Sequence, residues 1–182
     1  MERVGRLFFG LALPAEAIAA LSSRLEALDV PGGVVPPGNW HLTLRFIGEV
    51  DQVGLERLLA EVDQADLGDP FRVRLGEMGA FSRPQRAEAL WLGLAAGEEE
   101  VKVLGEVIEE ATQRAGFPPE DRPLHPHLTL SRMRPPGDVR PVIAAFRPAP
   151  IQWRVEEVVL FLSRLGRGGA RYERLEAFPL GN

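Results

Sequence analysis

The residues best suited to chemistry are histidines and threonines, which share a four-residue word that occurs twice. The word His-Leu-Thr-Leu occupies positions 41–44 and again positions 127–130. The chain contains only three histidines and three threonines in 182 residues. Two histidines that each have a threonine two places on are therefore improbable by chance, and the repeat points to a shared purpose.

Strand geometry explains the spacing within each word. Successive side chains of a strand point to opposite faces, so His41 and Thr43 share one face while the two leucines share the other. The leucines can then enter a core and leave the polar pair facing a cleft. Because His127 and Thr129 repeat the arrangement, we expect two imidazoles and two hydroxyls around one centre.

This set of groups suits displacement at phosphorus. The reaction needs a base on the attacking side, an acid on the leaving side and donors for the phosphate oxygens. An imidazole has an ordinary pKa of about 6.5, so one ring can be neutral and the other protonated near neutral pH. Threonine hydroxyls can donate to the phosphate, and this chemistry requires no metal.

The histidines and threonines also admit less specific roles. Threonine is common in strands because of its β propensity, and a single strand histidine is usually structural. A zinc site could use His41, His125 and His127, but Pro126 constrains the backbone between the last two. No carboxylate lies at a familiar ligand spacing, so we predict no metal site.

Residues next to the two words are candidate substrate contacts. By strand alternation Arg45 and Ser131 fall on the same faces as their words, and Arg132 follows directly. An arginine binds phosphate through paired hydrogen bonds, although a solvated surface arginine is the default. His125 could also touch substrate, or it could be a loop residue shaped by the prolines that flank it.

Three aromatic residues, Trp40, Phe46 and Phe81, could stack on a nucleobase. Packing in the core or in the wall of a cleft is the alternative for each of them. Of the two roles we expect packing for each residue.

The pattern of apolar residues predicts an α+β fold whose two halves repeat. Each half reads strand, helix, Pro-rich loop, strand, helix and strand. We expect strands over 6–13, 41–47, 71–75, 89–94, 127–131, 151–155, 158–162 and 171–178, with a turn at 166–169. We expect helices over 15–28, 53–65, 98–115 and 139–146, and loops over 31–38 and 118–126.

Composition limits the classes of protein and partner. The net charge of −5 means that any RNA must bind through a local basic site rather than a global field. The chain has no cysteine, which excludes disulfides and thiolate metal sites. The apolar run 7–13 is too short to span a membrane and lacks a cleavage site. We therefore expect a soluble cytoplasmic protein, and a monomer.

The two words resemble the signature of the 2H phosphoesterase superfamily. More closely, the chain resembles the bacterial and archaeal RNA 2′,3′-cyclic phosphodiesterases, also called 2′-5′ RNA ligases. The similarity covers nearly the whole chain, and its most specific segments are 6–14, 39–48, 89–94, 123–132 and 162–175.

The resemblance implies a single bilobal domain over 1–182, with two antiparallel-type sheets lining a central cleft and helices outside. Its lobes would cover roughly 1–80 and 85–165, and the closing hairpin 156–180 could be shared between them. The fold would be duplicated about a pseudo-twofold axis.

The resemblance also implies roles for the site residues. His41 would be the proton donor, His127 the proton acceptor, and Thr43 and Thr129 would hold the phosphate. The reaction would hydrolyse RNA 2′,3′-cyclic phosphate ends to 2′-phosphomonoesters without a cofactor, and its reverse would join ends through a 2′-5′ bond. The alternatives are a phosphodiesterase acting on small cyclic nucleotides and a non-catalytic module that binds RNA ends.

Overall fold

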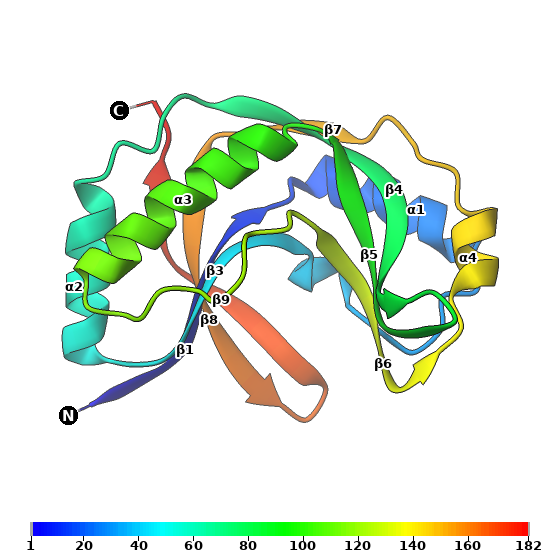
Figure 1. Ribbon diagram of the computed structural model, residues 1–182, viewed down its shortest axis with the longest axis horizontal. Coiled ribbons are helices and arrows are strands. Elements are labelled where there is room, and N and C mark those ends of the chain that lie inside the picture. Colours follow the sequence, from blue (N-terminus) through cyan, green and yellow to red (C-terminus); the bar gives the residue numbers. More distant parts are fainter. Residues whose placement is uncertain (1, 182) are drawn as a thin grey trace.

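The computed structural model describes residues 2–181 and contains one large antiparallel sheet with four α-helices (Figure 1). The strands are β1 (Arg3–Ala12), β2 (Gly33–Val34), β3 (His41–Asp51), β4 (Phe71–Arg83), β5 (Arg86–Ala96), β6 (Leu128–Gly137), β7 (Gln152–Val155), β8 (Glu157–Gly166) and β9 (Gly169–Pro179). The helices are α1 (Ala15–Glu26), α2 (Gln52–Asp63), α3 (Glu98–Arg114) and α4 (Arg140–Ala145), with a 3-10 turn η1 at Pro37–Asn39.

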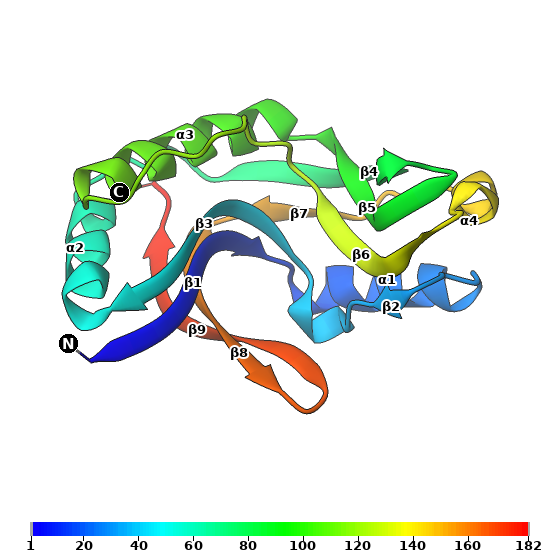
Figure 2. The ribbon, with the colours of Figure 1, turned by 60° about the horizontal axis from the view of Figure 1, so that its bottom comes forward.

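The strands form a single path in the order β7-β4-β5-β6-β3-β1-β8-β9, with β2 paired to β6. The two sheets that we expected are therefore joined. The junction between β3 and β6 is narrow, because Leu42 opposite Leu128 is the registered pair between them. Since so few hydrogen bonds hold the middle, the sheet can curve strongly there (Figure 2).

Strand pairing does not follow the order of the chain. Strand β4 belongs to the first half of the sequence, but it pairs with β5 and β7 of the second half. Strand β8 comes from the end of the chain and pairs with β1 and β9. Each half of the sheet thus combines strands from distant parts of the sequence, and the expected lobe boundaries, 1–80 and 85–165, stay a prediction.

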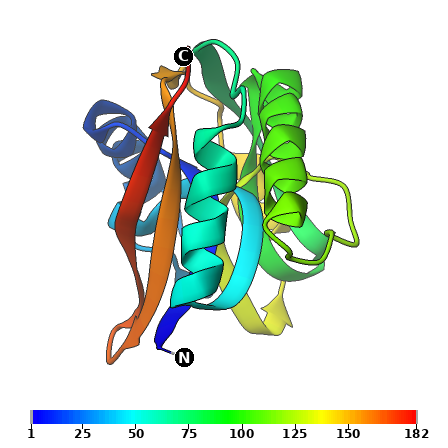
Figure 3. The same ribbon diagram turned by 90° about the vertical axis from the view of Figure 1, so that its left-hand side faces the viewer.

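A helix also packs against a half of the sheet other than the one that contains the strand before it. Helix α3 leaves β5 but packs against β3 of the other half and against α2, beside which it lies (Figure 3). Its buried residues recur at helical spacing and include Val101, Leu104 and Ile108. No helix within residues 2–181 is long and apolar enough to cross a membrane.

The curved sheet carries apolar side chains on both faces. Along β1, Leu7 and Phe9 belong to the main core, whereas Phe8 between them belongs to a separate cluster with Val159 and Phe161. Alternation along the strand places Phe8 on the opposite face. That face also carries the candidate site residues described below, so mainly aromatic side chains pack beneath them.

The predicted helices and strands are confirmed, with shifted ends. Strand β4 runs eight residues beyond the predicted 71–75, and register shifts interrupt its pairing with β5. Part of the predicted loop 31–38 forms β2, whose Gly33 pairs with Arg132. The hairpin turn at 166–169 is confirmed by the pairing of Gly166 with Gly169.

Candidate active site

The two His-Leu-Thr-Leu words lie side by side at the centre of the sheet. The first opens β3, and the second leads into β6. Leu42 and Leu128 face each other in register and are both 0% exposed. The histidine and threonine of each word are only half-buried. The predicted division into a core face and an open face is therefore confirmed for both words.

Each histidine is held by a backbone carbonyl two residues earlier. Nδ1 of His41 lies 2.7 Å from the Asn39 oxygen, and Nδ1 of His127 lies 2.6 Å from the His125 oxygen. A carbonyl can only accept, so each Nδ1 carries a proton and donates it. In both neutral rings Nε2 is then the unprotonated nitrogen, which leaves it able to accept or release a proton.

The first word contains a further hydrogen bond. Nε2 of His41 lies 2.9 Å from the hydroxyl of Thr43. With Nδ1 donating to Asn39, a neutral His41 accepts from Thr43, while a protonated His41 donates to it. Of the two words, only the first has such a bond within the described residues, so the two histidines are not equivalent in this structure.

Burial lowers the pKa of both histidines below the ordinary value. For His41 the carbonyl of Asn39 opposes this effect, while the positive charges of His127 and Arg132 reinforce it. For His127 the carbonyl of His125 opposes burial, while His125 and Arg132 reinforce it. The positive charge of Arg132 thus contributes to lowering the pKa of both imidazoles.

Aromatic rings form the wall around His41. The centroids of Phe8, Tyr172 and Phe161 lie 4.7, 5.1 and 6.0 Å from the imidazole centroid. Tyr172 meets the imidazole edge to face, with an interplanar angle of 87°. Phe161 and Tyr172 come from the β8–β9 hairpin. This hairpin therefore shapes the environment of a histidine that is more than 100 residues away in the chain.

A second aromatic group surrounds His127. The rings of Phe81, His125 and Trp91 lie 5.0, 5.8 and 6.2 Å from it. The Trp91 indole lies across Gly79 of β4, where a Cβ would come within 2.5 Å of the ring. A side chain at that position would displace the indole, so Gly79 is needed for this wall.

A register shift at the last residue of each word corrects the predicted face of the residue that follows the word. Gly10 pairs with Thr43 but Phe9 pairs with Arg45, so Leu44 is an extra residue on β3. Such a bulge reverses the alternation. The prediction that Arg45 shares a face with His41 is wrong, because its side chain is only 5% exposed on the core side.

There Arg45 anchors the loop that precedes the second word. It pairs with Glu109 of α3 and Glu120, and it donates to the Pro118 carbonyl. Burial acts to raise the pKa of Glu109, but hydrogen bonds from the Glu120 backbone, Gln113 and Arg45 hold it below its ordinary value. Arg45 is a structural residue in this arrangement.

The same shift occurs after the second word. Trp91 pairs with Thr129 but Leu90 pairs with Ser131, so Leu130 is the extra residue. Ser131 was predicted to share the face of His127, and this is wrong, because it is buried and donates to the carbonyl of Pro31. The shift turns Arg132 outward instead, where it is exposed and makes no ion pair with the described residues.

The three predicted stacking residues are placed differently. Trp40 is buried in the main core and takes the packing alternative. Phe46 is 55% exposed and lies beside Phe8, with 5.6 Å between ring centroids, while Phe81 is 37% exposed beside His127. Phe46 and Phe81 thus present aromatic surface near opposite histidines.

Sequence reasoning did not assign roles to Phe8, Asn39 or Tyr172. Asn39 could have been noticed as the residue two places before His41, matching His125 before His127. Its side-chain amide also donates to the Ala170 carbonyl of the β8–β9 hairpin, at 2.7 Å. Phe8 and Tyr172 carry no local signal, because their neighbours are set by long-range strand pairing.

The third histidine does not complete a metal site with the other two. Within residues 2–181 no three histidine, aspartate or glutamate side chains gather closely enough to hold a metal ion. The three-histidine zinc site that was considered as an alternative is therefore not assembled by the described residues.

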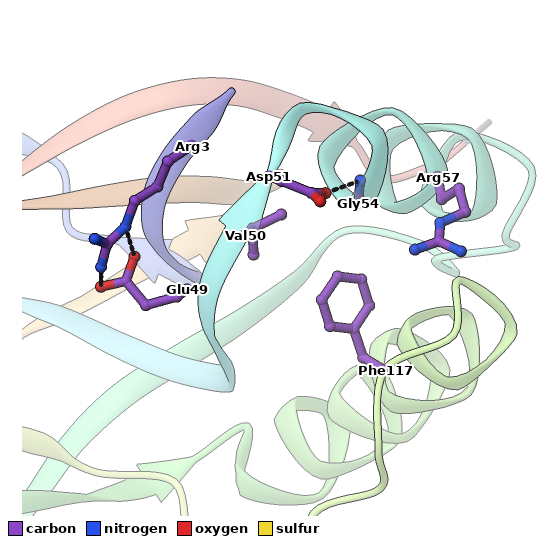
Figure 4. A pocket seen from close by; sticks show the side chains of 7 residues that line it. All are labelled: Arg3, Glu49, Val50, Asp51, Gly54, Arg57 and Phe117. Carbon is purple, nitrogen blue, oxygen red and sulfur yellow. Dashed lines mark hydrogen bonds and ion pairs between the residues drawn. The ribbon is translucent and has the colours of Figure 1, made fainter. Parts of the chain in front are cut away.

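A hollow of about 450 Å³ lies away from the histidines, between the β3–α2 junction and Phe117 (Figure 4). Asp51 there accepts from the backbone of Gly54 and so caps α2. Arg3 is paired with Glu49 in the same hollow. None of the predicted site residues lines it, so this hollow is separate from the candidate site.

Comparison with known proteins places the chain in a family. The profile of the 2′-5′ RNA ligase superfamily matches residues 11–167. An RNA 2′,3′-cyclic phosphodiesterase of Thermus thermophilus is 37% identical over 191 aligned positions, which cover 96% of this chain and 90% of the relative. The Escherichia coli protein of the same name is 30% identical and covers 99% of both chains.

Solved structures agree in fold. The crystal structure of Escherichia coli LigT in its apo form superimposes over the whole of both chains with a TM-score of 0.83 and 28% identity. Thermus thermophilus TT0787 gives a TM-score of 0.77 and 30% identity over 96% of this chain and 97% of its own. This chain belongs to the 2′-5′ RNA ligase superfamily, among the RNA 2′,3′-cyclic phosphodiesterases.

Proposed function

We propose that the protein hydrolyses RNA 2′,3′-cyclic phosphate ends to 2′-phosphomonoesters, with His41 as proton donor and His127 as proton acceptor. One observation carries this assignment: both imidazoles donate from Nδ1 to a carbonyl two residues earlier. Both Nε2 atoms are thereby left to exchange protons, on neighbouring strands, as an acid and a base require.

The bonds and protons balance through these two rings. A water attacks phosphorus and gives its proton to Nε2 of His127. The bond from phosphorus to the 3′ oxygen breaks, and protonated His41 gives its Nε2 proton to that oxygen. The phosphate stays on the 2′ oxygen, and proton exchange with solvent restores the two imidazoles.

Thr43, Thr129 and Arg132 would stabilise the phosphate. The hydroxyl of Thr43 already contacts Nε2 of His41, so a phosphate oxygen bound there would lie next to the proton that is transferred. Arg132 supplies a positive charge that both imidazoles sense. Donors aimed at the phosphate oxygens lower the barrier most when they are fixed before substrate binds.

A duplicated fold with a pseudo-twofold axis remains our inference. Two matching features support it, namely the carbonyl bonds of the two histidines and the register shifts at Leu44 and Leu130. In such a fold the centre between the words would be one site for one phosphorus.

The proposed class of substrate is inferred from related proteins. Escherichia coli LigT, which is similar in fold, has crystal structures in complex with 3′-AMP and with phosphate. A site of that kind in this chain would take a nucleotide end, and the exposed rings of Phe46 and Phe81 suit stacking on a base. RNA ends are the proposed partner, and small cyclic nucleotides are the second candidate.

The test is turnover of an RNA oligonucleotide that ends in a 2′,3′-cyclic phosphate, in the presence of EDTA, with the position of the product phosphate determined. We expect a 2′-phosphate. A 3′-phosphate product would contradict the leaving oxygen that we assign. Comparison with a 2′,3′-cyclic mononucleotide would decide between RNA and small nucleotides, and binding without turnover would favour a binding module.

A further inference from the structure

A cavity of about 580 Å³ has in its lining Trp91 and His125, two of the residues around His127. The ring centroids of Trp91 and His125 lie 6.2 and 5.8 Å from that of His127. Its other lining residues come from β4, β5, the start of α3 and the proline loops: Gly76, Glu77, Met78, Gly93, Leu94, Ala95, Glu98, Pro126 and Pro148. The volume lies in the range of small-molecule sites.

The register of the sheet places this cavity next to the proposed proton acceptor. Leu92 pairs with Leu128, so the next residue of β5, Gly93, lies beside His127. Gly93 continues the face of β5 that carries Trp91, and Ala95, where the pairing with β4 shifts register, also lines the cavity. A molecule in the cavity therefore lies near the ring of His127, which is not itself part of the lining.

In-line displacement at phosphorus indicates which reactant such a molecule would be. In the proposed function His41 protonates the leaving 3′ oxygen, so the nucleoside that bears the cyclic phosphate lies toward His41. The attacking group enters from the opposite side, at His127. In hydrolysis that group is water, and in ligation it is the 5′-hydroxyl of a second RNA end.

We propose that the cavity lined by Trp91, His125 and Glu98 binds the nucleoside of the 5′-hydroxyl RNA end. This assignment rests on the proposed function and extends it to a second substrate. The 5′ oxygen attacks phosphorus and gives its proton to His127, while the 3′ oxygen leaves with the proton of His41. The product is a 2′-5′ phosphodiester.

Charge and shape select this occupant. The lining includes Glu77 and Glu98 but no arginine or lysine among the described residues. Two carboxylates repel a phosphate, so the cavity suits a 5′ end that carries a free hydroxyl. The indole and imidazole offer stacking surfaces, and the carboxylates can accept from exocyclic amino groups of a base.

The experiment uses an RNA ending in a 2′,3′-cyclic phosphate as donor and adenosine as acceptor, with water as the competing nucleophile. The test variant is Ala95→Leu, which adds bulk to the cavity. Its matched control is Ala96→Leu, an exposed neighbour that does not line the cavity. Circular dichroism checks that both variants fold.

We expect Ala95→Leu to lower transfer to adenosine at least about tenfold while hydrolysis of the same donor stays within about threefold. Ala96→Leu should behave as wild type in both reactions. Equal loss of both reactions in Ala95→Leu, or unchanged transfer, would overturn the assignment, and so would a wild-type protein that hydrolyses the donor but never transfers to adenosine.

A second pair of variants tests the carboxylate. Glu98→Gln should reduce the preference for adenosine over purine riboside, which lacks the amino group, whereas Glu99→Gln should keep it, because Glu99 does not line the cavity. An unchanged preference in Glu98→Gln would argue against base recognition there. A wild-type protein without hydrolysis would instead overturn the proposed function, and this assignment with it.

Discussion

Nδ1 of His41 lies 2.7 Å from the backbone oxygen of Asn39, and the side-chain amide of Asn39 lies 2.7 Å from the carbonyl of Ala170. One residue therefore joins the proposed acid to the β8–β9 hairpin, which also carries Tyr172 against the same imidazole. The hairpin thus holds His41 in place by two contacts, one polar and one aromatic.

We expect Asn39→Ala to lower kcat/KM about tenfold, because the carbonyl that fixes the His41 tautomer loses its anchor. The alkaline limb of the pH profile should shift and the ¹⁵N signals of His41 should show mixed tautomers. Asn39→Gln keeps an amide donor and should recover part of the activity. A reduced rate with an unchanged pH profile and tautomer would mean that Asn39 only supports folding.

Replacement of either proposed catalytic histidine should remove most activity. His41→Ala and His127→Ala should each lower kcat by about 10²–10⁴-fold, the usual contribution of one acid or base. Steady-state turnover of the cyclic-phosphate RNA measures this, with circular dichroism as the folding control. His125→Ala is the comparison, since it removes a third imidazole but keeps the carbonyl that holds His127. A loss below tenfold at His41 or His127 would contradict its role.

The pH dependence follows from the two pKa directions. Catalysis needs protonated His41, so the rate falls as pH rises through the pKa of His41. It also needs neutral His127, so the rate falls as pH drops through the pKa of His127. Because burial lowers both pKa values, we expect a bell-shaped kcat/KM profile with its maximum below the ordinary histidine pKa of about 6.5.

Bound substrate should move this profile. The anionic phosphate favours protonated imidazoles, so the maximum of kcat should lie at higher pH than that of kcat/KM. Rates measured across pH 4–9 at limiting and saturating substrate would check both statements. A flat kcat/KM profile, with chemistry limiting the rate, would exclude catalysis by the two histidines.

Arg45 should matter for stability more than for chemistry. Arg45→Ala leaves Glu109 and the Pro118 carbonyl without their partner, and hydrogen bonds to charged groups of this kind contribute about 2 kcal/mol. Urea unfolding should therefore show a loss of about that size in the free energy of unfolding. Arg114→Ala breaks an exposed ion pair with Glu61 and should cost less than about 1 kcal/mol. A large fall in kcat without loss of stability would contradict this structural role and indicate that Arg45 acts in the active site.

The sequence by itself determined the chemistry-bearing words and the faces on which they lie. The alternation of His41, Leu42 and Thr43 follows from local strand geometry, which every residue of a strand obeys. The apolar spacing of α1, α2 and α3 likewise predicted their extents to within two residues at each end. Local rules were sufficient because these features depend on neighbours in the chain.

Tertiary structure decided which residues surround the words. The bulges at Leu44 and Leu130 depend on how β3 and β6 register against β1 and β5, and local sequence does not encode that register. They moved Arg45 and Ser131 into the core and turned Arg132 outward. The aromatic wall of His41 comes from β1, β8 and β9, which are brought together only by pairing between strands far apart in the sequence.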